Sequence, residues 1–245
     1  VVETAHVIAQ ARGISLEETI ELFRQRTDGA LISESEIREA HDLTDGHAFW
    51  LDLMAIQVSK VPGMTLKKLL EDVRRGRGDG PDVLSSIWDT LAPREQTVLR
   101  FMAETMRPET EDTIEKFVAS ELNYNKFKRS LKSLITLNLI VVKPESNAPD
   151  LYDLHPLVRQ FVRTRFERNE RNGFIRVVLN QYEIIIGAIE SMLGAFLPLP
   201  MLERWSQKAE LEISAGLYEQ AFETLYKVED AMIGGGHVEE FIRTA

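Results

Sequence analysis

The stretch that decides how this chain is organised is Leu151-Tyr152-Asp153-Leu154-His155-Pro156-Leu157-Val158-Arg159-Gln160-Phe161-Val162-Arg163. It begins with a short apolar alternation that predicts a β-strand, and after His155-Pro156 its apolar residues follow helical spacing. Proline is favoured at the first position of a helix because its missing N–H has no intrahelical partner there. The imidazole of His155 is therefore predicted to stand at a helix entrance, where unpaired N–H groups favour an anion such as phosphate.

The residues around this stretch predict a winged-helix domain over residues 81–172. From Val83 the apolar pattern indicates three helices, the last at about 124–137, followed by a strand at 139–142 and a polar loop. Together with the strand at 151–154 this makes a hairpin wing, and the helix after Pro156 closes the domain.

Residues 15–80 predict a domain made of helices. A capping box at Ser15 opens the first helix, a second begins at Ser33, and a third follows the turn Gly46-His47. The third helix carries apolar residues at so many positions that it is expected to be buried on most sides. Two interpretations of Gly46 stay open from the residues alone: a glycine turn that starts a bundle helix, or a turn that contacts a nucleotide. Residues 1–14 are expected to be a leader from a preceding domain.

The glycine-rich segment Gly76-Arg77-Gly78-Asp79-Gly80-Pro81 is expected to be a flexible linker between these two domains. A phosphate-binding loop requires two glycines five apart followed by Lys and then Ser or Thr, so that backbone amides surround the phosphates. No Lys-Ser or Lys-Thr follows here, so the segment is not interpreted as a nucleotide site.

Residues 173–245 predict a helical arm. An apolar face over 174–189 is followed by Pro198 and Pro200, which interrupt the helix. The residues after them resemble a tetratricopeptide repeat, a pair of helices that approach closely through small residues; this resemblance is carried by Trp205, Ala209, Gly216, Tyr218, Ala221 and Leu225. Lys208 and Glu212 depart from the pattern, since apolar residues are usual at their positions. Such repeats bury their faces against neighbours, so a longer array is expected beyond Ala245.

The histidine motif and the order of the domains resemble the STAND signalling ATPases, the class that includes the NB-ARC proteins. Leu154-His155-Pro156 is similar to the motif that closes their winged-helix domain, and Gly46-His47 is similar to the Gly-x-Pro turn of their helical lid, with Ala48 in place of proline. The fold implied is mainly α: a helical bundle lid, a winged helix with a small β-hairpin, and a superhelical arm of tetratricopeptide-like repeats. In this family these parts follow the nucleotide-binding core in the same order.

The resemblance implies that the chain is the regulatory part of a STAND-type ATPase switch. In the family the motif histidine contacts the β-phosphate of ADP and holds the protein closed, so His155, with Gly46 and His47, is an expected nucleotide contact. ADP or ATP, with Mg, would bind only together with the nucleotide-binding core, so this chain alone is expected to bind no cofactor and to have no enzymatic activity, whereas its parent is a candidate ATPase. The implied partners are that core, a protein ligand or regulator on the arm, and further copies of the protein after activation.

Composition excludes several other classes of function. The 245 residues include no cysteine, which rules out a disulfide scaffold and a Cys-ligated zinc site, and the five histidines are not paired at the spacing of metal ligands. No catalytic nucleophile with its base can be recognised, and no metal site is predicted. No apolar run approaches the roughly 20 residues needed to span a bilayer. A cytoplasmic location without membrane contact is expected.

Charge distribution leaves an alternative function open. The net charge of −10 argues against indiscriminate binding to nucleic acid. Residues 81–172, however, hold 14 basic and 14 acidic side chains, whereas residues 173–245 hold 5 and 11. A winged-helix transcription regulator is therefore the alternative interpretation, with the third helix contacting DNA phosphates through Lys126, Lys128, Arg129 and Lys132. A helical scaffold that binds no nucleotide is a further alternative.

Overall fold

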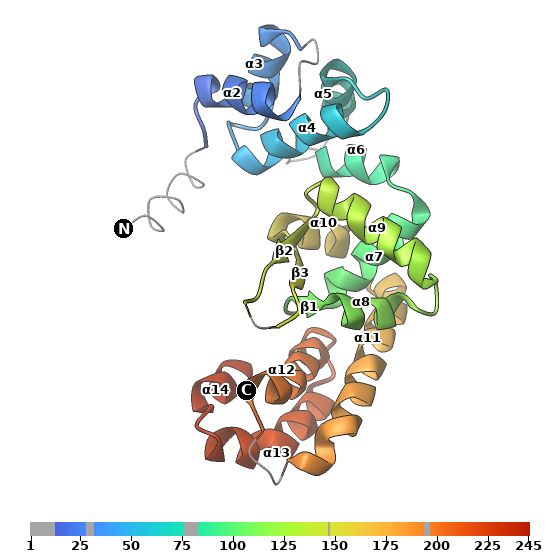
Figure 1. Cartoon of the computed structure of the whole chain (residues 1–245), viewed down its shortest axis with the longest axis vertical. Helices are drawn as coiled ribbons and strands as arrows, with labels where there is room; N and C mark the ends of the chain where they lie inside the picture. Colours follow the sequence, from blue (N-terminus) through green and yellow to red (C-terminus); the bar gives the residue numbers. More distant parts are fainter. Residues whose placement is uncertain (1–12, 28–31, 76–82, 147, 194–196) are drawn as a thin grey trace. The chain divides into compact units, whose positions relative to one another are not determined.

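The computed structural model describes residues 13–27, 32–75, 83–146, 148–193 and 197–245 (Figure 1). The fold is mainly α-helical with a small antiparallel sheet, which confirms the predicted class. Contacts between residues divide the chain into two compact units. Unit 1 runs to Pro93 and includes Lys132–Leu139, and unit 2 comprises Arg94–Leu131 and Ile140–Ala245. Among the described helices, none combines the length and the apolar composition needed to cross a membrane.

Unit 1 is built from five helices in the described ranges, α2 (Leu16–Arg26), α3 (Glu34–Leu43), α4 (Ala48–Lys60), α5 (Leu66–Arg75) and α6 (Val83–Thr90). Capping boxes open α2 and α3, as predicted for α2: Ser15 and Ser33 each accept from the backbone three residues later, and the glutamates at those positions bond back. The core of the unit surrounds α4, which contacts α2, α5 and α6. Six residues of α4 are buried, namely Leu51, Leu53, Met54, Ala55, Ile56 and Gln57. The expectation that this helix is buried on most sides is therefore confirmed.

The turn after α9 (Tyr124–Thr136) groups with unit 1, and a polar contact joins it to α4. Asn138 has a positive φ of 55°, and its Nδ2 donates to Asp52 Oδ2 at 2.9 Å. The other oxygen of Asp52 accepts from Arg26 Nε at 2.7 Å. One carboxylate on α4 thus binds both α2 and the turn, which joins residues distant in the sequence.

The winged helix lies mostly in unit 2, although the end of α9, from Lys132, groups with unit 1. Its elements are α7 (Pro93–Glu104), β1 (Glu109–Thr110), α8 (Glu111–Val118), α9 (Tyr124–Thr136), β2 (Ile140–Lys143), β3 (Leu151–Leu154) and α10 (Pro156–Arg165). The strand order is β1-β3-β2, and both pairs are antiparallel. The predicted hairpin is therefore present, but β1 was not predicted. A strand of two residues is too short to show alternation, and Glu109 and Thr110 are recognised as a strand only by pairing with Tyr152 and Leu151.

The arm occupies the rest of unit 2 and contains α11 (Arg168–Ile189), the short 3-10 helix η1 (Glu190–Met192), α12 (Leu199–Ser214), α13 (Tyr218–Gly234) and α14 (Val238–Thr244). Figure 1 shows α11, α12 and α13 packed in sequence order, and their apolar faces meet in one cluster made of Ile186, Leu197, Leu202, Trp205, Val228 and Met232. Pro198 is the N-cap residue of α12, in agreement with the predicted interruption.

The domain boundaries predicted from the sequence differ in part from the grouping in the structure. The predicted boundary between residues 172 and 173 falls inside α11, which is continuous from Arg168. The predicted winged-helix domain, residues 81–172, includes α6, but in the structure α6 groups with unit 1. Two further predictions lie outside the described residues. They are the linker at 76–81, with the boundary between residues 80 and 81, and residues 1–12 of the predicted leader.

Candidate functional site

His155 stands at the N-terminus of α10, directly after β3, as the sequence predicts. Its backbone is extended enough to act as the N-cap, and its Nδ1 accepts a hydrogen bond from the N–H of Leu157 at 3.3 Å. Pro156 occupies the first helical turn. Because Nδ1 is an acceptor, the proton of the neutral ring is on Nε2, so this nitrogen is a donor. A phosphate oxygen requires a donor of that kind.

Two arginines that follow the motif hold α10 against the end of α7. Arg159 Nη1 donates to the carbonyl of Met102 at 2.7 Å, and Arg163 Nε donates to that of Ala103 at 2.6 Å. These carbonyls are in the last turn of α7, where no intrahelical donor is available to them. Arg159 Nη2 also donates to Asp153 on β3 at 2.6 Å. The orientation of the helix that carries His155 is therefore set by these side chains.

Both arginines belong to the stretch 151–163, but its sequence pattern predicts no role for them. Their i, i+4 spacing predicts only that they share a face of α10. That this face meets the carboxyl end of α7 depends on the tertiary structure. A hollow of about 420 Å³ lies beside the motif, and it is lined by Met106, Asp153, Leu154, Pro156, Arg159, Gln160, Arg163 and Thr164.

Gly46 and His47 lie in unit 1, whereas His155 lies in unit 2. Gly46 has a φ of +68°, and a Cβ added to it would lie 2.5 Å from the carbonyl oxygen of Ile14. Glycine is thus required by the backbone at this position. His47 is the N-cap residue of α4, makes no capping bond with its side chain, and has a buried Nδ1 without a hydrogen-bond partner among the described residues. A contact of either residue with nucleotide stays a prediction.

The four basic residues proposed for DNA contact lie on α9. Lys126, Arg129 and Lys132 are exposed, whereas Lys128 Nζ bonds both carboxylate oxygens of Glu111, at 2.5 and 2.6 Å. Their charge is thus partly neutralised within the domain itself. The DNA interpretation stays a prediction.

The arm contributes to two polar clusters, each of which joins residues that are distant in the sequence and were not predicted to meet. Lys208 Nζ donates to Glu212 Oε1 at 2.7 Å and to Thr224 Oγ1 at 2.9 Å, and Thr224 donates to Glu212 Oε2 at 2.8 Å. The two residues that depart from the repeat pattern are thereby paired with each other. Glu109 of β1 accepts from Tyr182 of α11 at 2.7 Å and from Arg204 of α12 at 2.6 Å. The described residues contain no group of three or more acidic or histidine side chains placed to hold a metal ion.

Comparison with solved structures finds a similar fold in a signal transduction ATPase with numerous domains (STAND) from Pyrococcus horikoshii, a protein with a tetratricopeptide repeat sensor. The TM-score is 0.53, the sequence identity is 17%, and the match covers 95% of this chain and 34% of that chain. The resemblance predicted from the sequence is thus confirmed at the level of the fold, and this chain spans about a third of the protein it matches. Comparison with protein-family models and with curated proteins found no match.

Proposed function

We propose that this chain is the regulatory part of a STAND-type ATPase switch, in which the winged helix stabilises the ADP-bound closed state and the arm senses a partner. The observation that carries the proposal is the position of His155, at the entrance of a fixed helix in a chain whose fold matches part of a STAND protein. The nucleotide-binding core would be supplied by the rest of a longer protein.

The chemistry of the motif supports binding of a diphosphate. The Nε2–H of His155 provides a donor, and the N-terminus of α10 adds the partial positive charge of its helix dipole. Arg159 and Arg163 keep the helix in place, so little conformational entropy is lost when the ring binds. For Gly46 and His47, the contact proposed is with the base and ribose of a nucleotide held by the core.

The switch is a two-state equilibrium biased by this contact. A hydrogen bond to a charged phosphate contributes about 1.5–3 kcal/mol, which shifts the balance between closed and open states roughly ten- to a hundredfold. Exchange of ADP for ATP removes the contact, the winged helix moves away from the core, and the open form associates with further copies. A ligand or partner on the arm favours the open form only if it binds that form more tightly.

The proposal is tested by His155→Ala in the longer protein that carries the nucleotide-binding core. We expect ADP to dissociate about ten- to a hundredfold faster, because the lost bond is worth about 1.5–3 kcal/mol, and basal activation to rise. Release of a fluorescent ADP analogue after dilution measures the rate, and size-exclusion chromatography reports the oligomer.

A second variant separates phosphate binding from helix capping, because alanine also removes the acceptor for the Leu157 N–H. His155→Asp keeps a good N-cap residue but has no donor and repels phosphate. It should fold as stably as the natural protein and still release ADP quickly. Retention of ADP by His155→Asp at the rate of the natural protein would show that His155 acts only as a cap.

A further inference from the structure

A buried ion pair replaces apolar packing between α12 and α13. The side chain of Lys208 is 13% exposed and that of Glu212 is 4% exposed, and both bond Thr224 of α13. Replacing a buried ion pair by apolar residues of similar size is often neutral or stabilising, so stability alone is a weak reason for these residues. Their position beside a pocket suggests a reason of another kind.

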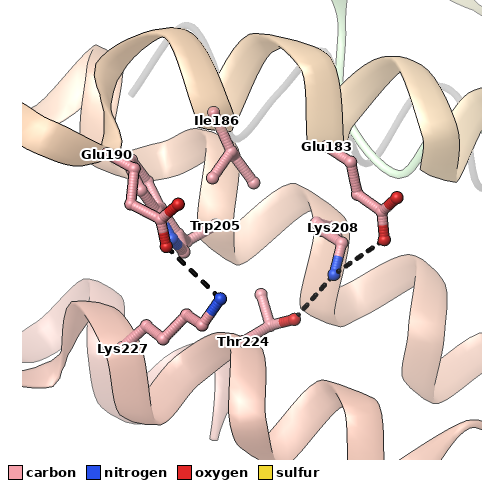
Figure 2. Close-up of a pocket in the computed structure, with 8 residues that line it drawn as sticks. Glu183, Ile186, Glu190, Trp205, Lys208, Thr224 and Lys227 are labelled. Carbon is pink, nitrogen blue, oxygen red and sulfur yellow. Dashed lines mark hydrogen bonds and ion pairs between the residues drawn. The ribbon is translucent and has the colours of Figure 1, made fainter.

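The pocket lies between α11, α12 and α13 within the arm (Figure 2). Its volume is about 200 Å³, which suits a molecule smaller than a typical drug-sized ligand. The lining residues come from these three helices and, for Glu190, from the start of η1, namely Glu183, Ile186, Gly187, Glu190, Trp205, Lys208, Thr224 and Lys227. Figure 2 shows Ile186 between two charged ends, one with Glu190 and Lys227 and the other with Glu183 and Lys208.

Among the described residues, the pocket wall holds one donor group without an acceptor, the Trp205 indole, and one ammonium, that of Lys208, with two acceptors for its three protons. The Lys208 ammonium uses two of its protons on Glu212 and Thr224, and its next anion, Glu183, is 3.7 Å away. The indole Nε1 of Trp205 is buried and has no hydrogen-bond partner among the described residues. A buried donor without an acceptor is unfavourable, so an oxygen placed near Trp205 would stabilise this part of the arm.

The ion pair between Glu190 and Lys227, at the Trp205 end of the pocket, is weak. Glu190 and Lys227 are 3.3 Å apart, and their side chains are 44% and 61% exposed. An exposed pair of this kind is weak because water and salt screen it. A ligand that carries both charges can replace it: its anion takes Lys227 and its cation takes Glu190, so that no charge is left unpaired.

We propose that this pocket binds a small zwitterion with an α-amino-acid head group. The carboxylate accepts from Lys227 and from the Trp205 indole, the ammonium donates to Glu190, and the side chain of the ligand extends along Ile186 toward Lys208. This inference rests on the proposed sensing function of the arm and names the class of ligand that is sensed.

The direct test follows the Trp205 indole resonance by NMR. The chain has three tryptophans and hence three indole N–H signals, and Trp205→Phe identifies the relevant one. Each standard L-amino acid is added separately at millimolar concentration. At least one should shift the Trp205 signal selectively and saturably, while the signals of Trp50 and Trp88 stay in place. No shift with any of them would overturn the proposal.

The two charges of the head group are tested with analogues of the amino acid that binds best. Its deaminated acid and its decarboxylated amine should each bind about tenfold or more weakly, because each loses a charge-assisted hydrogen bond. Equal binding of the acid would show that the pocket binds an anion only, and it would contradict the zwitterion.

Matched variants assign the contacts. Glu190→Gln should weaken binding of the amino acid about tenfold but leave binding of the deaminated acid unchanged. Lys227→Gln should also weaken binding of the amino acid about tenfold, but it should leave binding of the decarboxylated amine unchanged. Lys116→Gln, at an exposed pair with Asp112 on α8, is the control and should change neither affinity. Unchanged binding in both pocket variants would place the amino acid elsewhere.

These measurements involve neither His155 nor ADP. A negative result here would therefore not contradict the proposed nucleotide switch, and a negative result for His155→Ala would not contradict binding of an amino acid in the pocket.

Discussion

Gly46 and Gly13 meet where two turns cross in unit 1. The N–H of Ile14 donates to the carbonyl of Gly46 at 2.8 Å, and His41 Nε2 lies 3.0 Å from the carbonyl oxygen of Ile14. A Cβ on Gly13 would lie 2.6 Å from the carbonyl oxygen of Asp45. Packing between two backbones therefore accounts for the presence of glycine at both positions.

Gly46→Ala is expected to destabilise unit 1. The left-handed conformation costs an L-residue roughly 1–2 kcal/mol, and the overlap with the Ile14 carbonyl adds to that cost. The decrease in the free energy of unfolding is measured by urea denaturation followed by circular dichroism.

Gly173→Ala is the matched control for this substitution. Gly173 lies within α11, and a Cβ there would meet no atom within 4 Å. The variant should gain roughly 0.5–1 kcal/mol, because alanine loses less conformational entropy than glycine on helix formation. If Gly46→Ala were as stable as the natural chain, backbone packing would not explain the glycine.

At the scale of elements, Arg107 connects the segment between α7 and β1 to the arm. Its guanidinium donates to Glu210 of α12 at 2.7 Å and to Glu240 of α14 at 2.6 Å. All three side chains are largely buried. These ion pairs hold the helices of the arm on the winged helix within unit 2. Their partners are separated by more than 100 positions in the sequence, so local patterns carry no signal for them.

Arg107→Met is expected to lower the free energy of unfolding by about 1.5–3 kcal/mol at neutral pH, because it leaves Arg243 as the one remaining cation partner, among the described residues, of the buried carboxylates of Glu210 and Glu240. The loss should depend on pH. Burial raises the pKa of Glu240, but hydrogen bonds from Arg243 and Arg107 outweigh burial and hold this pKa below 4.5. The stability contributed by Glu240 is thus present above about pH 4.5 and disappears as the pH falls through its pKa in the folded protein.

The destabilisation by Arg107→Met should therefore become smaller in acid, when the carboxylates are protonated in the natural protein and in the variant alike. Urea denaturation at several pH values measures the free energy of unfolding of the natural protein and of the variant. Lys116→Met provides the control, because its pair with Asp112 is exposed and contributes little. A penalty for Arg107→Met that grew as the pH fell would contradict this account.

At the scale of the whole chain, charge bears on the alternative of DNA binding. The net charge is −10, and Lys128 on α9 is already paired with Glu111. We expect the chain not to shift duplex DNA in a gel at low salt, because repulsion by the acidic surface opposes the few contacts that Lys126, Arg129 and Lys132 can make. Salt-sensitive binding that is lost when these three residues are changed to Glu would instead support the winged-helix regulator.

Local sequence patterns were sufficient to predict most of the helices, the two strands of the hairpin, and the placement of His155 before a proline at a helix entrance. These features depend on residues within a few positions of one another, through apolar spacing, capping and the geometry of proline. Strand β1 was not predicted, because it forms only through pairing with β3. The continuity of α11 from Arg168 was not predicted either, because Gly173 lies inside this long helix and does not end it.

The assembly of the candidate sites, in contrast, depends on the tertiary structure. The tertiary structure brings Arg159 and Arg163 onto the carbonyls of α7 and pairs Lys208 with Glu212 and Thr224. Within the described part of the chain, it provides no acceptor for the indole nitrogen of Trp205. The physical reason is that a buried charge or donor is acceptable only where a partner from another element meets it, and such partners are chosen by packing rather than by neighbours in the sequence.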